Sequence, residues 1–206
     1  MDGRAHSPAA VLDFWFAGPR DDAQLMAARN AVWFGSNQAF DSEIRLRFGD
    51  LLAAAEQGDL QHWQLSASGT LALILVCDQF SRNVYRATPR AFALDARAQA
   101  LARDGVAQGI DRELAIIERS FFYLPFEHAE DNEAQKLAVR CFESLDLEAP
   151  AAFKAVTADA LHWARDHHAI VARFGRLPHR NLILDRPSTP DEVAWLAAHP
   201  NGYGQG

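Results

Sequence analysis

Hydrophobic positions recur every three to four residues along almost the whole chain, and the alternation typical of strands is nearly absent. The clearest case is the segment 36–58, where apolar side chains share one face of a predicted helix: Phe40, Ile44, Phe48, Leu51 and Ala55. Ser36 is the expected cap of this helix, and Gly58 is its expected end. The pattern predicts an all-α protein.

Start and stop signals divide this pattern into about nine helices joined by short links. Ser7 and Thr189 each precede a proline, which is typical of helix N-termini, and Glu192 completes a capping box with Thr189. The expected helices cover 7–16, 22–34, 36–58, 68–80, 88–109, 111–123, 125–145, 150–174 and the segment from 189 onward. Since no long linker separates them, residues 1–206 are predicted to form one domain of helices in antiparallel pairs.

Composition limits the class of protein. Hydrophobic residues make up 49% of the chain, with 13 Phe and 5 Trp, so a large core is expected. The net charge of −7 argues against a nucleic-acid partner or an anionic membrane surface. The longest apolar run, 71–77, is far shorter than the roughly 20 residues of a membrane helix. Two cysteines without a pairing motif suit a reducing compartment, and the predicted location is the cytoplasm.

A first polar cluster directly follows the most apolar predicted helix. Asp78 and Gln79 are therefore expected near the core, where an unpaired carboxylate would be costly. Arg82 stands four residues after Asp78, at the spacing of a helical ion pair, and Asn83 is its neighbour. The pair is either a purely structural contact or one wall of a pocket.

A second polar cluster surrounds Pro125, which is expected to begin a helix. That start would place Glu127 and Glu130 in the first turns, where the helix dipole favours carboxylates. The two glutamates share a helix face, so repulsion is expected to raise the pKa of one of them. His128 is either a proton-transfer group or a hydrogen-bonded packing residue.

A third cluster follows the predicted helix 150–174. Gly175 is the expected left-handed end of this helix, and Arg176 is placed favourably at the negative end of the dipole. Pro178 holds the preceding residue extended, so the next three residues are expected to form a fixed turn. These are His179, Arg180 and Asn181.

Common metal, nucleotide and nucleophile motifs are missing, so no metal or cofactor is predicted. The charges of the three clusters are more informative. If the clusters converge, four arginines face three carboxylates: Arg82, Arg86, Arg176 and Arg180 against Asp78, Glu127 and Glu130. Near balance suits a network that only satisfies itself, whereas the slight positive excess suits a small anionic ligand. The sequence leaves both readings open.

The same clusters carry a family resemblance. The blocks DQFSRN, LPFEHAED and FGRLPHRN resemble the signature of an uncharacterised bacterial family, domain of unknown function 924, and the likeness covers nearly the whole chain. It implies a tetratricopeptide-like helical fold and no established activity. The chain departs from the family pattern, which has proline, serine, phenylalanine and glycine in place of Ser81, Ala129, Leu177 and Asp185. The alanine removes a hydroxyl, which weighs against a serine-based mechanism.

Two functional hypotheses follow. The first is a binding module for a small anionic ligand or an acidic peptide, with these ligand-binding residues: Asp78, Gln79, Arg82, Asn83, Arg176, Arg180 and Asn181. The alternative is a hydrolase or lyase whose general acid and base come from Glu127, His128, Glu130 and His179. In a third reading, the clusters only hold the helices together. The oligomeric state is left open.

Overall fold

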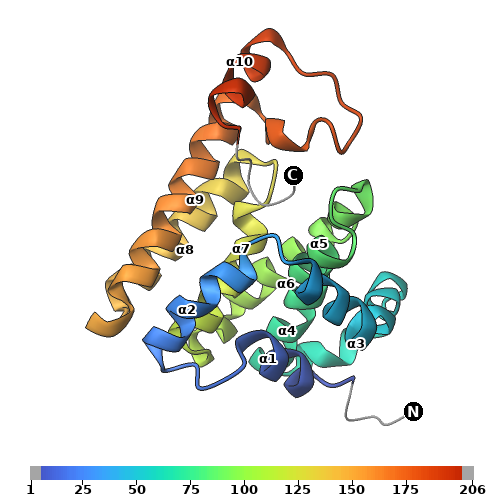
Figure 1. Cartoon of the computed structure of the whole chain (residues 1–206). Coiled ribbons are helices and arrows are strands. Elements are labelled where there is room, and N and C mark those ends of the chain that lie inside the picture. The colour runs from blue at the N-terminus through green and yellow to red at the C-terminus, as the bar shows by residue number, and fades with distance from the viewer. Residues whose placement is uncertain (1–5, 201–206) are drawn as a thin grey trace.

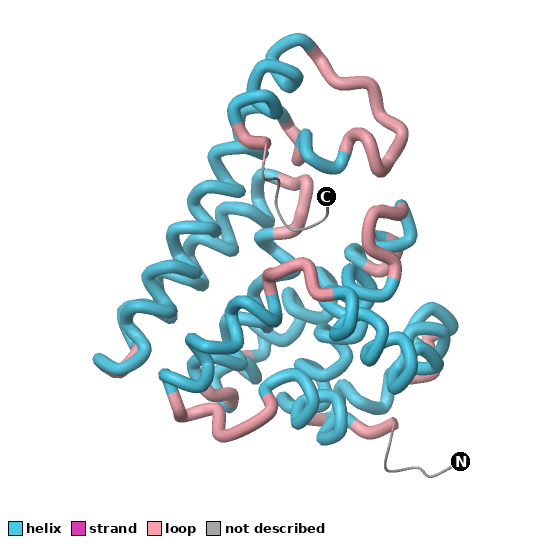
Figure 2. Tube along the Cα trace, viewed as in Figure 1, coloured by secondary structure: helices cyan, strands magenta, loops and turns pink. Residues whose placement is uncertain are grey.

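The computed structural model describes residues 6–200, which form helices and loops and contain no strand (Figures 1 and 2). The helices are α1 (Pro8–Phe16), α2 (Ala23–Trp33), α3 (Gln38–Gln57), α4 (Ala67–Ile74), α5 (Ser81–Val84), α6 (Asp95–Gln108), α7 (Ile116–Glu127), α8 (Asn132–Glu148), α9 (Lys154–Phe174) and α10 (Pro190–Ala198). A π-helical turn, Leu75–Phe80, joins α4 and α5 into one continuous helix. Counted so, the described residues form nine helical rods, and the predicted all-α class is confirmed.

The helices fall into two groups that meet at α7. On one side, α7, α8 and α9 pack as antiparallel neighbours, so α7 and α9 run in the same direction (Figure 1). On the other side, α1, α3 and α6 pack around the long α4–α5 rod, and α7 contacts both α4 and α6. The stacked hairpins are compatible with a tetratricopeptide-like arrangement, which stays a prediction, as does the single-domain organisation.

The α4–α5 rod is buried on all sides, as its apolar sequence predicts. Every residue from Gly69 to Val84 is buried, and the rod packs against aromatic side chains such as Trp15 and Phe48. Helix α6 approaches α7 closely because Gly105 has no Cβ; an added one would lie 2.4 Å from the Phe122 ring. Within residues 6–200, no helix is long and apolar enough to cross a membrane.

Several predicted helix starts are wrong. Helix α6 begins at Asp95 instead of residue 88, and α7 begins at Ile116 instead of residue 111, because the 3-10 turns Pro89–Phe92 and Ile110–Glu113 precede them. Asn37, not Ser36, caps α3 through its side chain. More important for function, Pro125 does not begin a helix but lies inside the last turns of α7, and α8 starts at Asn132 with Asp131 as its cap. Packing explains the difference, because every residue from 119 to 127 is buried and the core outweighs one lost backbone hydrogen bond.

The C-terminal segment folds back as predicted. Gly175 ends α9 with φ 69°, and a short 3-10 turn, η6 (Pro178–Arg180), follows. Helix α10 begins with the predicted Thr189–Glu192 capping box. Asp185 adopts φ 51°, in the left-handed region, which accounts for the glycine that the resemblance expects there.

Candidate functional site

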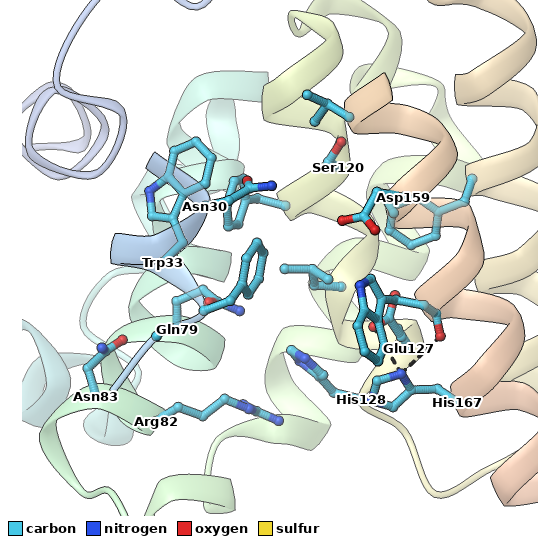
Figure 3. A pocket seen from close by; sticks show the side chains of 18 of the residues that line it. Asn30, Trp33, Gln79, Arg82, Asn83, Ser120, Glu127, His128, Asp159 and His167 are labelled. Atoms are coloured by element: carbon cyan, nitrogen blue, oxygen red, sulfur yellow. Dashed lines mark hydrogen bonds and ion pairs between the residues drawn. The ribbon is translucent and has the colours of Figure 1, made fainter. Parts of the chain in front are cut away.

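A cavity of about 420 Å³ opens between the end of α2, the α4–α5 rod, α7, α9 and η6 (Figure 3). It is lined by polar and by apolar side chains. The polar ones are Asn30, Gln79, Arg82, Asn83, Arg86, Ser120, Glu127, His128, Asp159, His167, His179 and Arg180. The three sequence clusters therefore converge in part, and each contributes to one cavity.

The π-helical turn contains the first of these clusters. Asp78 is 1% exposed, and its Oδ1 lies 2.9 Å from Nη1 of Arg82, so the predicted ion pair is confirmed. The same guanidinium also binds Asp95 in a bidentate manner at 2.9 and 3.0 Å. Arg82 thus reaches the cavity with its charge already balanced by two carboxylates.

His128 is held by the same aspartate. Its Nδ1 lies 2.8 Å from Asp78 Oδ1, so Nδ1 carries the proton and Nε2 is the basic nitrogen. Burial would raise the pKa of Asp78, but the charge of Arg82 and the contact with His128 lower it well below its usual range. Burial also lowers the pKa of His128, against the opposing effect of Asp78, so the imidazole is neutral at pH 7.

Glu127 stands at the end of α7, near the negative end of its dipole, so the dipole argument for this glutamate does not hold. Its Oε1 lies 3.2 Å from Nδ1 of His167, which also donates to the carbonyl of Trp163 at 3.0 Å (Figure 3). Burial, with the charges of Asp78 and Asp166, raises the pKa of Glu127 to about 8. The expected cause, repulsion from a second glutamate, is wrong.

Neutral histidines complete the polar wall. Burial and, to a smaller extent, the charge of protonated His128 lower the pKa of His167 to about 4. Burial and the charge of Arg180 lower the pKa of His179 to about 2. The rings of His128 and His167 lie 6.5 Å apart. At neutral pH, this wall therefore offers uncharged donors and acceptors beside the arginines.

Arg180 is the least satisfied charge at the cavity. It is 5% exposed, its Nη1 approaches Asp95 at 3.4 Å, and its guanidinium stacks over the ring of Phe92. Its Nε finds no hydrogen-bond partner within residues 6–200. Burial and the neighbouring charge of Arg82 lower the pKa of Arg180 to about 10, so it remains charged at pH 7.

Four predicted site residues are not part of the cavity lining. Asp78 contacts the lining residues Arg82 and His128, and the other three lie away from the cavity. Glu130 accepts hydrogen bonds from the backbone of Leu177 and from Arg186, at 2.8 and 2.6 Å. Arg176 pairs with Glu192 of α10 at 2.6 Å, and Asn181 donates to Ser188 at 3.0 Å. These contacts fasten the segment 176–189 to the rest of the molecule, and so position η6.

Three further residues singled out in the sequence line the cavity wall, and each of them is held by a carboxylate. Asn83 donates to Asp41 at 2.6 Å, and Arg86 holds the same carboxylate at 2.8 Å. Gln79 lines the cavity and donates to Asp78 at 2.6 Å. Asn83 and Arg86 are thus held by a carboxylate that stands 42 and 45 residues earlier in the sequence, whereas Gln79 is held by its immediate neighbour.

Sequence reasoning missed several functional candidates. Asp95, which balances both arginines, stands in the first turn of a helix and looks like an ordinary dipole-favoured carboxylate. His167 lies in a pair of histidines on α9, and its spacing to His162 gives no ligand signal. Within residues 6–200, no three His, Cys, Asp or Glu side chains form a group that could hold a metal ion.

The comparisons with known proteins agree with this fold. The family model for bacterial proteins of unknown function, DUF924, matches residues 11–200. A solved structure of a protein of unknown function from Agrobacterium tumefaciens is similar, with 37% identity and a TM-score of 0.78, over 93% of this chain and 97% of that one. The comparison with curated proteins gave no match. The chain belongs to the DUF924 family of bacterial proteins of unknown function.

Proposed function

We propose that the protein is a binding module for a small anionic ligand, which occupies the cavity beside Arg180. The observation that carries the proposal is the poor pairing of this buried guanidinium. Burying a charge is expensive unless it is paired and hydrogen-bonded. Arg180 shares Asp95 with Arg82 at a long 3.4 Å, and its Nε is unsatisfied among the described residues.

The local charges support the same conclusion. Two arginines, Arg82 and Arg180, face two carboxylates, Asp78 and Asp95, but both carboxylates bind Arg82 at 2.9 Å. The four charges sum to zero, and because both carboxylates lie against Arg82, the positive end of this cluster is at Arg180. Neutral His179 and a protonated Glu127 are hydrogen-bonding groups that do not repel an anion. A carboxylate or phosphate oxygen would complete the hydrogen bonding of the guanidinium.

The test is a calorimetric titration with acetate, inorganic phosphate and triglutamate, the last as a probe for an acidic peptide. We expect wild-type protein to bind at least one of the two small anions, and Arg180→Met to weaken that binding at least about tenfold. Arg165→Met is the matched control, because Arg165 is exposed on α9 and outside the cavity lining. Equal affinity of wild type and Arg180→Met would refute the proposal, and binding of triglutamate alone would replace the small ligand with a peptide.

A second candidate function is a hydrolase or lyase that uses general acid–base catalysis. The specific observation is a base and an acid at the same cavity: His128, oriented by Asp78, and Glu127, which holds its proton at neutral pH. In this scheme Nε2 of His128 accepts a proton from the substrate or from water, Glu127 donates one to the leaving group, and Arg180 holds the substrate anion.

The acid–base scheme is tested by a screen of ester, amide and β-elimination substrates. Any activity should fall at least about 100-fold in His128→Asn and in Glu127→Gln, since general acid–base groups contribute at this level. The pH–rate profile of the wild type should fall above about pH 8 as Glu127 loses its proton. Activity retained at full rate by both variants would leave the binding function alone.

A further inference from the structure

The cavity changes character from one end to the other along two parallel helices. On α7 the lining residues follow one helix face: Ile117, Ser120, Phe121, Leu124, Glu127 and His128. On α9 they are Val156, Asp159, Ala160, Trp163 and His167. Both helices begin mostly apolar and end polar, and the polar ends coincide because Glu127 contacts His167.

The length of this gradient follows from helix geometry. Eleven residues separate Ile117 from His128, and eleven separate Val156 from His167, which at a rise of about 1.5 Å per residue is about 16 Å. A bare carboxylate or phosphate would occupy only the polar end of such a cavity. The apolar part has room for the body of a larger molecule.

Six of the apolar lining residues are aromatic: Trp33, Phe34, Phe92, Phe121, Phe142 and Trp163. Two of them remain open to solvent, with Phe34 54% and Trp163 44% exposed. Phe34 stacks on Phe121 at 6.0 Å with nearly parallel planes, so flat ring faces are already aligned at the wall. Aromatic side chains favour stacked or edge-to-face contact with a ring.

The charge of the ligand follows from the pairing of the arginines. The charges of Arg82, Arg180, Asp78 and Asp95 sum to zero, but both carboxylates lie against Arg82, so the guanidinium of Arg180 is the positive end of this neutral cluster. A singly charged carboxylate adds one negative charge to this cluster, whereas a dianionic phosphate would add two beside Asp78 and Asp95. Asp159 lines the apolar part and disfavours a second acidic group on the ligand body.

We infer that the cavity takes an aromatic monocarboxylate, with its carboxylate on Arg180 and its ring among the aromatic side chains of α2, α7 and α9. This inference rests on the proposed anion site and adds the chemical class of the ligand body. The polar end holds the acid group of the ligand, and the aromatic side chains remove its ring from water.

Calorimetric titrations with five small molecules test the inference on the full chain. Phenylacetate is the expected ligand; acetate lacks its ring, and phenylacetamide lacks its charge. Cyclohexylacetate replaces the aromatic ring with a saturated one, and phenyl phosphate replaces the carboxylate with a phosphate. We expect phenylacetate to bind at least about tenfold more tightly than each of the other four. Phe34→Ala and Trp163→Ala should each weaken phenylacetate and leave acetate unchanged, while Leu147→Ala, an exposed change on α8, should alter neither.

Each outcome separates this inference from the function on which it rests. Phenylacetate that binds no more tightly than acetate, with both dependent on Arg180, overturns the aromatic body and leaves the anion site intact. Tighter binding of cyclohexylacetate would contradict the aromatic ring of the ligand, and tighter binding of phenyl phosphate would contradict its carboxylate. If the wild type binds none of the five molecules but binds inorganic phosphate, only the inference fails; if it binds neither these five nor inorganic phosphate, the proposed anion site fails as well.

Discussion

Two arginines at the cavity should respond in opposite ways to the same substitution. Arg82→Met removes the partner of Asp78 and Asp95, whose side chains are 1% and 13% exposed. Breaking a buried ion pair usually costs about 3–5 kcal/mol. Asp78 keeps its hydrogen bonds from His128 and Gln79, so we expect the lower end, about 3 kcal/mol of unfolding free energy.

Arg180→Met should not destabilise the unliganded protein. In the folded state the pKa of Arg180 falls from 12.5 to about 10, mainly through burial. At about 1.4 kcal/mol per pKa unit, the charge costs the fold on the order of 3 kcal/mol. The pKa shift already includes the attraction of Asp95, but the substitution also removes the contact of the guanidinium with Phe92, which offsets part of the stabilisation. We expect the net change to lie between zero and about 2 kcal/mol of stabilisation.

The assay is chemical and thermal unfolding of both variants in a buffer without carboxylate or phosphate ions, which could occupy the cavity. For a chain of this length, about 3 kcal/mol corresponds to a fall of roughly 6–12 °C in Tm for Arg82→Met. The Tm of Arg180→Met should equal or exceed that of the wild type. If both variants lose the same stability, Arg180 is a structural group, and the argument for a ligand on it is refuted.

Three further predictions concern pH, packing and the C-terminal segment. Glu127 has a raised folded pKa of about 8, so its contribution to stability is full below about pH 4.5 and is lost as the pH rises through 8. Between about pH 6.5 and 8, above the pH at which histidines titrate, the unfolding free energy of the wild type should fall, and that of Glu127→Gln should change less. Identical slopes for the two proteins would show that Glu127 is not the source of this pH dependence. Gly105→Ala should lower the unfolding free energy by about 1–3 kcal/mol, because its Cβ would lie 2.4 Å from a phenylalanine ring. Gly49→Ala has open space around it and should stabilise α3 by about 0.5–1 kcal/mol. Equal denaturation midpoints of the two variants would contradict the packing argument. Glu130→Gln should speed amide exchange in the segment 176–189 and weaken anion binding, and unchanged exchange would show that Glu130 does not fasten this segment.

Local signals in the sequence were sufficient for most of the fold. The helical period, the left-handed end at Gly175 and the capping box of α10 each depend on contacts within a few residues. The prediction failed at Pro125, where the local preference for a helix start lost to the burial of the surrounding side chains. The π-helical turn at Asp78 was not foreseen, because no composition rule marks the extra residue that widens a helix.

For the site, the sequence by itself determined which residue types are available and one ion pair, Asp78–Arg82, because its partners stand one helical turn apart. Only the tertiary structure decided how the charges divide. Asp95 reaches Arg82 across 13 residues and Arg180 across 85, while Glu130 turns away to Arg186. Such pairings depend on how whole helices pack. Burial then decides which groups are charged: Glu127 keeps its proton at neutral pH, and the guanidinium of Arg180 keeps an Nε without a hydrogen-bond partner among the described residues.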